Sequence, residues 1–386
     1  MKPANSILAS YGTTIFEVMS RMAQAHNAIN LGQGIPDGNG PPDVVAVAKD
    51  YLENGLNQYP SMMGIPALRE AVAVINKRFY GLAVDGLSEV MVTSGGTEAL
   101  AASLFALIEP GDEVVLIEPL YDSYLPIVKR AGGVAKLVRL EPPNWELSEK
   151  ALERVFSNKT KLILLNSPMN PCSKVFSKYE LSIIAQLVEK FEAYAICDEV
   201  YEHLLFDGLE HIPLMTLPGM RERCIRIGSA GKTFSLTGWK VGYITASPNL
   251  LAPISKAHQF LTFTTPPNLQ AAVAFGLSKN KSYFTSLSEE LQKCRDLLAE
   301  GLKNIGFEIM PCQGSYFITA DFRPLGFSGN DEDFCRHITS EAQVAAVPVS
   351  AFYQGGGVEH FVRFCFCNEE KTLIEAIDRL RKHFGC

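Results

Sequence analysis

Lys232 is the residue of this chain best suited to covalent chemistry. It lies in residues 229–240, a stretch that is too polar and glycine-rich for a core and too hydrophobic for a solvated loop. A lysine attacks a carbonyl when its surroundings favour the neutral amine, and a second cation at Lys240 suits a site that also holds an anion. An ordinary surface lysine beside a turn is the alternative. The pair therefore favours a ligand that carries both an aldehyde and a phosphate.

A second stretch, residues 92–100, has the composition of a phosphate-binding turn. It joins an apolar run to a helical pattern through Ser94-Gly95-Gly96-Thr97. Glycines let the backbone approach an anion, and the free amides and positive dipole end of a helix N-terminus attract it. A tight turn with a Thr or Ser cap explains the same residues, so this motif is informative only together with the others.

Polar residues also follow two apolar runs. Asn170 stands between Pro168 and Pro171, which fix a rigid turn, and its amide can donate to a phenolate oxygen or meet a substrate carboxylate. Asp198 ends a buried run, where an unpaired carboxylate is costly and a protonated pyridine nitrogen is a suitable partner. Tyr201, three residues on, can donate to the same phenolate oxygen. Loop caps, helix caps and a rim aromatic are the alternatives.

One arginine, Arg363, interrupts the apolar pattern of residues 360–366. A guanidinium in such a strand needs a planar anion, and the α-carboxylate of an amino acid fits it in a bidentate way. A structural ion pair to a core Asp or Glu is the alternative. An aldehyde, a phosphate, a phenolate oxygen and a pyridine nitrogen occur together in pyridoxal phosphate. The combined motifs therefore predict a site for pyridoxal phosphate and an amino acid.

Strands and helices must hold these residues in place, and the apolar runs indicate an α/β fold. Short apolar runs alternate with helical patterns from about residue 45 to residue 280, which is typical of βα units around a mostly parallel sheet covered on both faces. Ligands bind at the carboxyl ends of such strands, so the polar clusters are expected to meet there. The expected strands are residues 89–93, 113–117, 161–166, 194–197, 224–227 and 241–245.

The pattern changes beyond residue 267 to a smaller α+β unit. A long amphipathic helix over residues 286–306 leads to several short strands and a final helix over residues 369–383. The first 40 residues contain one amphipathic helix, residues 15–25, and are expected to pack on this unit. We therefore predict a large domain over residues 45–280 and a small domain made from residues 1–44 and 281–386. The expected small-domain strands are residues 307–310, 316–319, 344–347 and 361–366.

Composition narrows the function further. Of the 386 residues 47% are hydrophobic and 20% charged, and the net charge of -7 argues against nucleic acid or an anionic membrane surface as a partner. The nine cysteines contain no C-x-x-C pair, so neither a disulfide framework nor a metal site is expected. No stretch approaches the roughly 18 apolar residues of a membrane span, and residues 1–6 lack an apolar signal core. A small-molecule partner and a cytoplasmic location are expected.

The order of these motifs resembles the class I/II aminotransferases of pyridoxal phosphate fold type I. Within them it is most similar to the kynurenine, methionine and aromatic aminotransferase branch. The resemblance runs from about Thr14 to Leu380 and implies a large domain with a mostly parallel sheet plus a smaller α+β domain. It is carried by residues 30–37, 58–60, 94–97, 166–171, 198–201, 229–240 and 362–364.

Carried over by position, the resemblance implies a role for each matching residue. Lys232 would bond covalently to the cofactor, Asp198 would pair with the pyridine nitrogen, and Asn170 and Tyr201 would bind the phenolate oxygen. Tyr121 would stack on the cofactor ring. The phosphate would be held by Gly96, Thr97, Ser229 and Lys240, and by Tyr59 of a neighbouring subunit, which implies a homodimer with shared active sites.

The resemblance also implies a substrate site. Gly34, Asn170 and Arg363 would hold the substrate carboxylate, and Phe16 would line the side-chain pocket. Tyr11, Tyr121 and residues 260–264 favour an apolar or aromatic pocket, and no second arginine is placed for a dicarboxylate. Transfer of the amino group of a neutral L-amino acid, either methionine-like, aromatic or aliphatic, to a 2-oxo acid is the expected activity. A cysteine-conjugate β-lyase and a non-catalytic sensor of pyridoxal phosphate are the alternatives.

Overall fold

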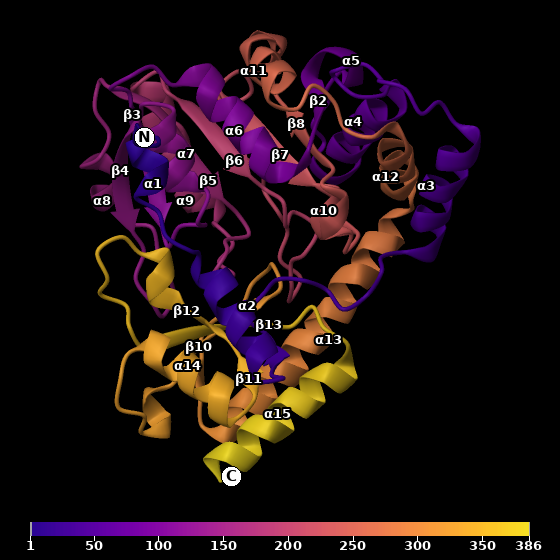
Figure 1. Ribbon diagram of the computed structural model, residues 1–386. Helices are drawn as coiled ribbons and strands as arrows, with labels where there is room; N and C mark the ends of the chain where they lie inside the picture. The colour runs from indigo at the N-terminus through magenta and orange to yellow at the C-terminus, as the bar shows by residue number, and fades with distance from the viewer. Residues whose placement is uncertain (1, 386) are drawn as a thin grey trace.

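The computed structural model describes residues 2–385, and a seven-stranded sheet forms its larger part (Figure 1). The strand order is β2-β8-β7-β6-β5-β3-β4, and every pair is parallel except the two that involve β8. The mostly parallel sheet predicted from the apolar runs is therefore confirmed. Its strands are β2 Val90–Thr93, β3 Glu113–Glu118, β4 Val134–Arg139, β5 Thr160–Asn166, β6 Tyr194–Asp198, β7 Cys224–Ser229 and β8 Gly242–Thr245.

Helices cover both faces of this sheet and continue into a second unit (Figure 1). They are α1 Ser6–Ala9, α2 Ile15–Ala25, α3 Pro42–Asn54, α4 Pro66–Tyr80, α5 Gly86–Glu89, α6 Gly95–Leu107, α7 Tyr124–Arg130, α8 Glu149–Glu153, α9 Lys178–Lys190, α10 Ala230–Thr233, α11 Pro248–Leu261, α12 Pro267–Ser278, α13 Lys281–Ile305, α14 Asp331–Glu341 and α15 Glu370–Phe384. Short 3-10 turns are Leu214–Thr216, Thr237–Trp239, Arg323–Leu325 and Val349–Phe352.

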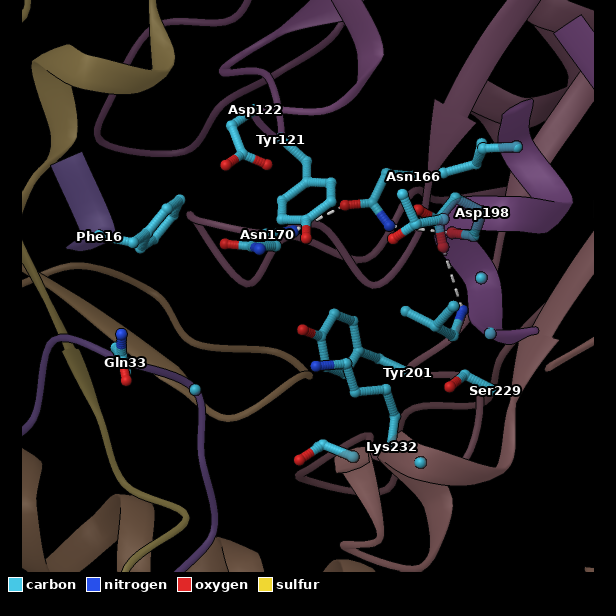
Figure 2. Close-up of a pocket in the computed structure, with 18 of the residues that line it drawn as sticks. Phe16, Gln33, Tyr121, Asp122, Asn166, Asn170, Asp198, Tyr201, Ser229 and Lys232 are labelled. Carbon is cyan, nitrogen blue, oxygen red and sulfur yellow. Dashed lines mark hydrogen bonds between the residues drawn. The ribbon is translucent and has the colours of Figure 1, made fainter. Parts of the chain in front are cut away.

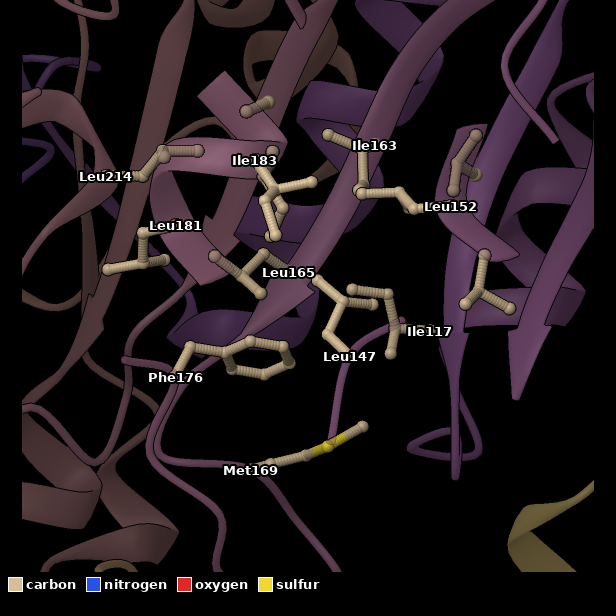
Figure 3. Packing of buried hydrophobic residues seen from close by; sticks show 14 of the residues in the cluster. Ile117, Leu147, Leu152, Ile163, Leu165, Met169, Phe176, Leu181, Ile183 and Leu214 are labelled. Atoms are coloured by element: carbon tan, nitrogen blue, oxygen red, sulfur yellow. The ribbon is translucent and has the colours of Figure 1, made fainter. Parts of the chain in front are cut away.

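Strand β5 illustrates why the sheet is buried on both sides. Ile163 and Leu165 enter one hydrophobic cluster, while Leu162 and Leu164 enter another on the opposite face. Figure 3 shows the first cluster, in which Ile163 and Leu165 lie near Ile183 of α9. A strand that is apolar at consecutive positions is stable only between two layers of helices, so these residues specify the three-layer arrangement.

A smaller unit is built from antiparallel strands. Its sheet has the order β12-β13-β10-β9, and a separate two-stranded parallel sheet joins β1 to β11. Through β1, and through contacts of α2 with α14, the first segment of the chain packs on the C-terminal unit as expected. The strands are β1 Ile29–Asn30, β9 Glu308–Ile309, β10 Phe317–Asp321, β11 Val344–Ala345, β12 Val347–Pro348 and β13 Phe361–Cys365.

The structure corrects the expected elements in three places. Strand β4 was not predicted; it is one of the two edges of the sheet, and only Val138 among its six residues is buried. The single strand expected over residues 344–347 is two strands, because β11 pairs with β1 and β12 pairs with β13. Helix α13 begins at Lys281, five residues before the expected start. The domain bounds remain a prediction, and Met1 and Cys386 lie outside the described residues.

Candidate active site

A cavity of about 440 Å³ opens at the carboxyl ends of β5, β6 and β7. Open α/β sheets bind ligands at this edge. Figure 2 shows Asp198, Tyr201 and Lys232 around the same space. The walls contain every predicted site residue except Tyr59, namely Phe16, Gly34, Gly96, Thr97, Tyr121, Asn170, Asp198, Tyr201, Ser229, Lys232, Lys240 and Arg363.

The N-terminus of α6 forms one end of this cavity. Gly95 has a φ of +81°, and a Cβ atom added there would lie 3.1 Å from Cε of Lys240. The Lys240 side chain therefore lies against the first turn of α6, where free amides and the positive dipole end favour an anion. Within residues 2–385, the Ser94 side chain gives this turn no capping hydrogen bond, which leaves its amides for a ligand. This end of the cavity fits a phosphate.

Asp198, the last residue of β6, is buried beside the cavity. The Tyr124 hydroxyl donates to its Oδ2 at 2.6 Å, and the Val200 amide donates to its Oδ1 at 3.4 Å. Burial nevertheless raises the pKa of Asp198 to about 6, because the charged form loses its hydration. A cation against this carboxylate would favour the ionised form, and a protonated pyridine nitrogen is such a cation.

Lys232 lies on α10, the short helix that follows β7. Its Nζ donates a hydrogen bond to the Tyr316 hydroxyl at 2.9 Å and lies 5.7 Å from the ring centroid of Tyr201. Burial lowers the pKa of Lys232, because the ammonium form is the one that loses hydration. A larger fraction of neutral amine follows near neutral pH, as a nucleophile or proton acceptor requires.

Arg363 lines the same cavity, and within the described chain one of its three guanidinium nitrogens has no hydrogen bond. Its Nη1 donates to Oδ1 of Asn170 at 2.7 Å, and its Nη2 donates to the Gly32 carbonyl at 2.6 Å. The guanidinium carbon lies 3.9 Å from the ring centroid of Phe317. Nε is buried and has no hydrogen-bond partner among residues 2–385. A buried guanidinium with a spare donor suits a carboxylate, and Asn170 keeps its own amide N–H groups for the same ligand.

The outer part of the cavity is aromatic and acidic. Phe16 of α2 contacts Phe352 edge-on, with ring centroids 5.7 Å apart, and lies 5.1 Å from the Arg363 guanidinium carbon. Glu17 and Asp122 also line this region. Figure 2 shows Asp122 and Phe16 on the side of the cavity away from Lys232.

Some aromatic residues expected near the site lie outside the cavity of this chain. Tyr59 is 82% exposed, and its ring contacts Phe263 edge-on at a centroid distance of 5.4 Å. Tyr11 and residues 260–264 do not line the cavity walls in the described chain. Tyr11 instead lies under Nζ of Lys129, 5.8 Å from the ring centroid. The aromatic side-chain pocket of this chain is therefore limited to Phe16, Tyr121 and their neighbours.

Two tyrosines that hold the central residues were not predicted. Tyr124 and Tyr316 lie 74 and 84 positions from their partners Asp198 and Lys232, so no local spacing identifies them. Tyr316 was expected only as an aromatic residue of the strand over residues 316–319. Tyr124 follows Tyr121 by three residues, which is the only local feature that connects it with the site.

Known proteins resemble this chain over nearly its full length. A family model described as aminotransferase class I and II matches residues 26–380. Probable N-succinyldiaminopimelate aminotransferase of Mycobacterium tuberculosis is 42% identical over 97% of both chains. Methionine aminotransferase of Escherichia coli is 39% identical over 98% of this chain and 97% of its own. Human kynurenine–oxoglutarate transaminase 1 is 37% identical over 94% of both chains.

Solved structures agree with this result. N-succinyldiaminopimelate aminotransferase from M. tuberculosis superposes with a TM-score of 0.95 at 42% identity, over 98% of this chain and 99% of its own. An E. coli protein with a methionine aminotransferase function superposes with a TM-score of 0.96 at 38% identity, over 99% of this chain and 100% of its own. The predicted α/β fold of the pyridoxal phosphate enzymes is confirmed. The chain belongs to the class I and II aminotransferases and is an enzyme that uses pyridoxal phosphate to transfer the amino groups of amino acids.

Proposed function

We propose that this enzyme transfers the amino group of a neutral L-amino acid, methionine-like, aromatic or aliphatic, to a 2-oxo acid. The distribution of charge in the cavity carries the proposal. Among the described residues, the cations of the wall are Lys232, Lys240 and Arg363, while Asp122 lies on the side away from Lys232. Glu17 also lines the cavity and is paired with Arg21 at 2.6 Å. Each of these cations is already assigned to the cofactor or to the α-carboxylate, so the wall has no further cation for a second carboxylate on the substrate.

The proposed cofactor-binding residues follow from the same geometry. Bound pyridoxal phosphate supplies an aldehyde that takes up amino groups and a pyridine ring that withdraws electrons. We assign Lys232 to the covalent link, Asp198 to the pyridine nitrogen, and Asn170 and Tyr201 to the phenolate oxygen. Tyr121 covers the ring face, and the phosphate is held by Gly96, Thr97, Ser229 and Lys240, all of which line the cavity.

Arg363 binds the substrate, and Lys232 acts on its Cα proton. Arg363 and Asn170 bind the α-carboxylate, together with the backbone at Gly34, and so fix the position of the Cα–H bond. Burial disfavours the ammonium form of Lys232, so Nζ is a neutral amine once the substrate amino group has replaced it in the covalent link. It then removes the Cα proton and carries it until the proton is returned to the substrate–cofactor adduct. Phe16 contacts the substrate side chain.

A half-reaction without acceptor tests both the chemistry and the substrate class. Purified, cofactor-loaded protein is titrated with single amino acids, and the 2-oxo acid and the visible absorption are measured. We expect one equivalent of 2-oxo acid from methionine, phenylalanine or leucine and little from aspartate or glutamate. Lys232→Ala should abolish the reaction, while the exposed Lys150→Ala serves as the control. A dicarboxylate as the best donor would contradict the proposed substrate class, and catalytic release of pyruvate and ammonia would indicate a β-lyase.

We also propose a homodimer in which Tyr59 of one copy completes the phosphate site of the other. Exposed apolar side chains of two segments support it: Tyr59 and Phe263 touch each other, and both segments carry further uncovered residues. Surface of this kind is stable when a second protein covers it. The exposed side chains are Leu52, Leu56, Tyr59, Phe260, Leu261 and Phe263.

Two coarser expectations complete the proposal. The seven-stranded sheet falls within the large domain proposed for residues 45–280, and the other two sheets fall within residues 1–44 and 281–386. Limited proteolysis with mass spectrometry tests these bounds. Each helix within residues 2–385 is too short or too polar to span a membrane. The cytoplasmic location remains a prediction, which cell fractionation tests.

A further inference from the structure

Tyr316 lies behind Lys232, between the lysine and the segment that contains Gly34. Its side chain is 2% exposed. Its hydroxyl accepts a hydrogen bond from Nζ of Lys232 at 2.9 Å and donates one to the Gly34 carbonyl at 3.2 Å. It is thus the one described residue for which hydrogen bonds to both Lys232 and Gly34 are present.

The Tyr316 hydroxyl has three partners, because its side chain is also hydrogen-bonded to that of Tyr201. A tyrosine hydroxyl has a single hydrogen, and the Gly34 carbonyl can only accept it. With its hydrogen donated to Gly34, the oxygen of Tyr316 acts as the acceptor toward Lys232, and one N–H of the lysine points at Tyr316. Since burial raises the pKa of Tyr316 well above its ordinary value, this hydroxyl keeps its hydrogen over the working pH range.

The packing around Gly34 makes this contact specific. A Cβ atom at Gly34 would lie 2.8 Å from Cε2 of Tyr316 and 3.0 Å from Cζ of Phe317. No larger residue fits between the backbone and these rings without displacing them. The neighbouring Gly32 carbonyl accepts from Arg363 at 2.6 Å. The segment over residues 32–34 is therefore tied to Arg363 on one side and, through Tyr316, to Lys232 on the other.

We propose that Tyr316 is a positioning residue, which holds the free amine of Lys232 with its lone pair turned into the cavity and ties that amine to the carboxylate-binding segment. The inference rests on the proposed role of Lys232. When Lys232 is a free amine, the Tyr316 oxygen occupies one N–H direction, so the lone pair is directed away from Tyr316. A lone pair aimed at the substrate Cα removes its proton faster than one that rotates freely.

Tyr316→Phe tests this inference because it keeps the buried ring and removes only the hydroxyl. In full-length protein without cofactor, the pH dependence of Lys232 labelling by a small acylating reagent, read by peptide mass spectrometry, gives the pKa of the amine. We expect this pKa to fall by about one unit, since the ammonium form loses a hydrogen-bond acceptor. In loaded protein, kcat should fall about tenfold and the isotope effect of substrate deuterated at Cα should rise, with a smaller change in KM.

A matched control is Tyr243→Phe, which removes another buried tyrosine hydroxyl from the sheet, where the ring packs against Gly228. It should leave the pKa of Lys232 and the isotope effect unchanged. Thermal unfolding establishes that both variants are folded. If Tyr316→Phe lowers kcat but leaves the pKa and the isotope effect at wild-type values, Tyr316 is only structural and the inference is wrong.

Failure of the proposed function gives a different result. Borohydride reduction of the loaded wild-type protein, followed by peptide mass spectrometry, locates the lysine that carries the cofactor. Attachment at a lysine other than Lys232 would overturn the proposed function and this inference together. Attachment at Lys232, combined with an unchanged Lys232 pKa in Tyr316→Phe, would overturn this inference alone.

Discussion

Asp198 shows how a single buried carboxyl links cofactor binding to stability. Its pKa of about 6 in the folded chain lies above the ordinary 3.8. Between these pH values the folded chain binds more protons than the unfolded chain, so the stability contributed by this group falls as pH rises through that range. The loss amounts to at most about 3 kcal/mol. The cofactor-free protein therefore carries a cost that a cationic partner would remove.

Asp198→Asn removes the pH-dependent contribution of this carboxyl to stability, because an amide does not ionise. Without cofactor, we expect the unfolding midpoint of the variant to rise relative to wild type between about pH 4 and pH 6.5. With pyridoxal phosphate added at pH 7.5, the wild type should have the higher unfolding midpoint, since only the carboxylate pairs with the pyridine nitrogen. Scanning calorimetry at several pH values measures both effects. A difference that does not change with pH would contradict the assignment.

Arg363→Lys tests the carboxylate site at the same scale. An ammonium cannot make the two planar hydrogen bonds that Arg363 makes to Asn170 and Gly32 while also presenting a donor to the substrate. We expect kcat/KM for neutral amino acids to fall between about 10-fold and 100-fold. Arg323→Lys, at an exposed arginine paired with Asp321, is the control. Steady-state kinetics with equal losses in both variants would show that the effect is not specific to the site.

Residue chemistry was more predictable from the sequence than residue contacts. Asp198 and Arg363 are charged groups in apolar patterns, so the energetic cost of burying them indicates a ligand. Lys232 was identified by its glycine-rich stretch and by the second cation at Lys240. Tyr124 and Tyr316 are aromatic residues whose burial needs no explanation. Their hydrogen bonds to Asp198 and Lys232 depend on tertiary packing, which local sequence does not describe.

At the scale of elements, the turn between β2 and α6 combines backbone freedom with anion binding. Gly95→Ala would meet both a φ of +81° and the Lys240 side chain. We expect the Kd of pyridoxal phosphate to rise at least about tenfold, because Lys240 and the first turn of α6 move apart. Fluorescence titration of the cofactor-free protein measures this Kd.

Gly111→Ala is a matched control that introduces only the backbone strain of a positive φ. Gly111 has a φ of +93°, and the described chain leaves open space where its Cβ would stand. It should cost about 1 kcal/mol of stability and leave the Kd of the cofactor unchanged. Equal weakening of cofactor binding in the two variants would attribute the effect to strain and not to the phosphate site.

Local signals determined how well each element was predicted. Helix α2 begins and ends as expected, and Thr14 caps it by accepting a hydrogen bond from the Glu17 amide at 3.3 Å. The edge strand β4 lacks the continuous apolar pattern of the inner strands, since only Val138 of its residues is buried. The division of residues 344–347 into β11 and β12 depends on which distant strands are available to pair, and periodicity contains no such information.

At the scale of the whole molecule, the proposed dimer predicts a response to a single surface charge. Phe260 is 83% exposed in the single chain. We expect Phe260→Asp to weaken association at least about tenfold, because it would bury a charge in an apolar interface. Cofactor affinity should fall with it, since Tyr59 would no longer reach its site. Sedimentation velocity measures association, and Tyr179→Asp, at another exposed aromatic residue of 69% exposure, is the control.

The α/β fold and the change of pattern near residue 267 were predictable, because both rest on periodicity along the chain. The contact between the two ends of the chain was predicted only in outline. Its details depend on residues such as Gly32 and Arg363, which are 331 positions apart. A hydrogen bond between residues so far apart in the chain forms only when the elements between them have packed, so local sequence does not predict it.

The parallel pairing of β1 with β11 has a consequence for biosynthesis. The ribosome produces β1 before β2 to β8, whereas β11 and Arg363 emerge after all of these strands. Strands β2 to β8 and the phosphate-binding turn need no residue beyond β8 to complete their sheet, so we expect them to fold first on the nascent chain. Meanwhile Met19 and Leu31, both buried in the finished protein, remain uncovered. We therefore expect the part of the active site that binds the cofactor to form before the part that binds the amino acid.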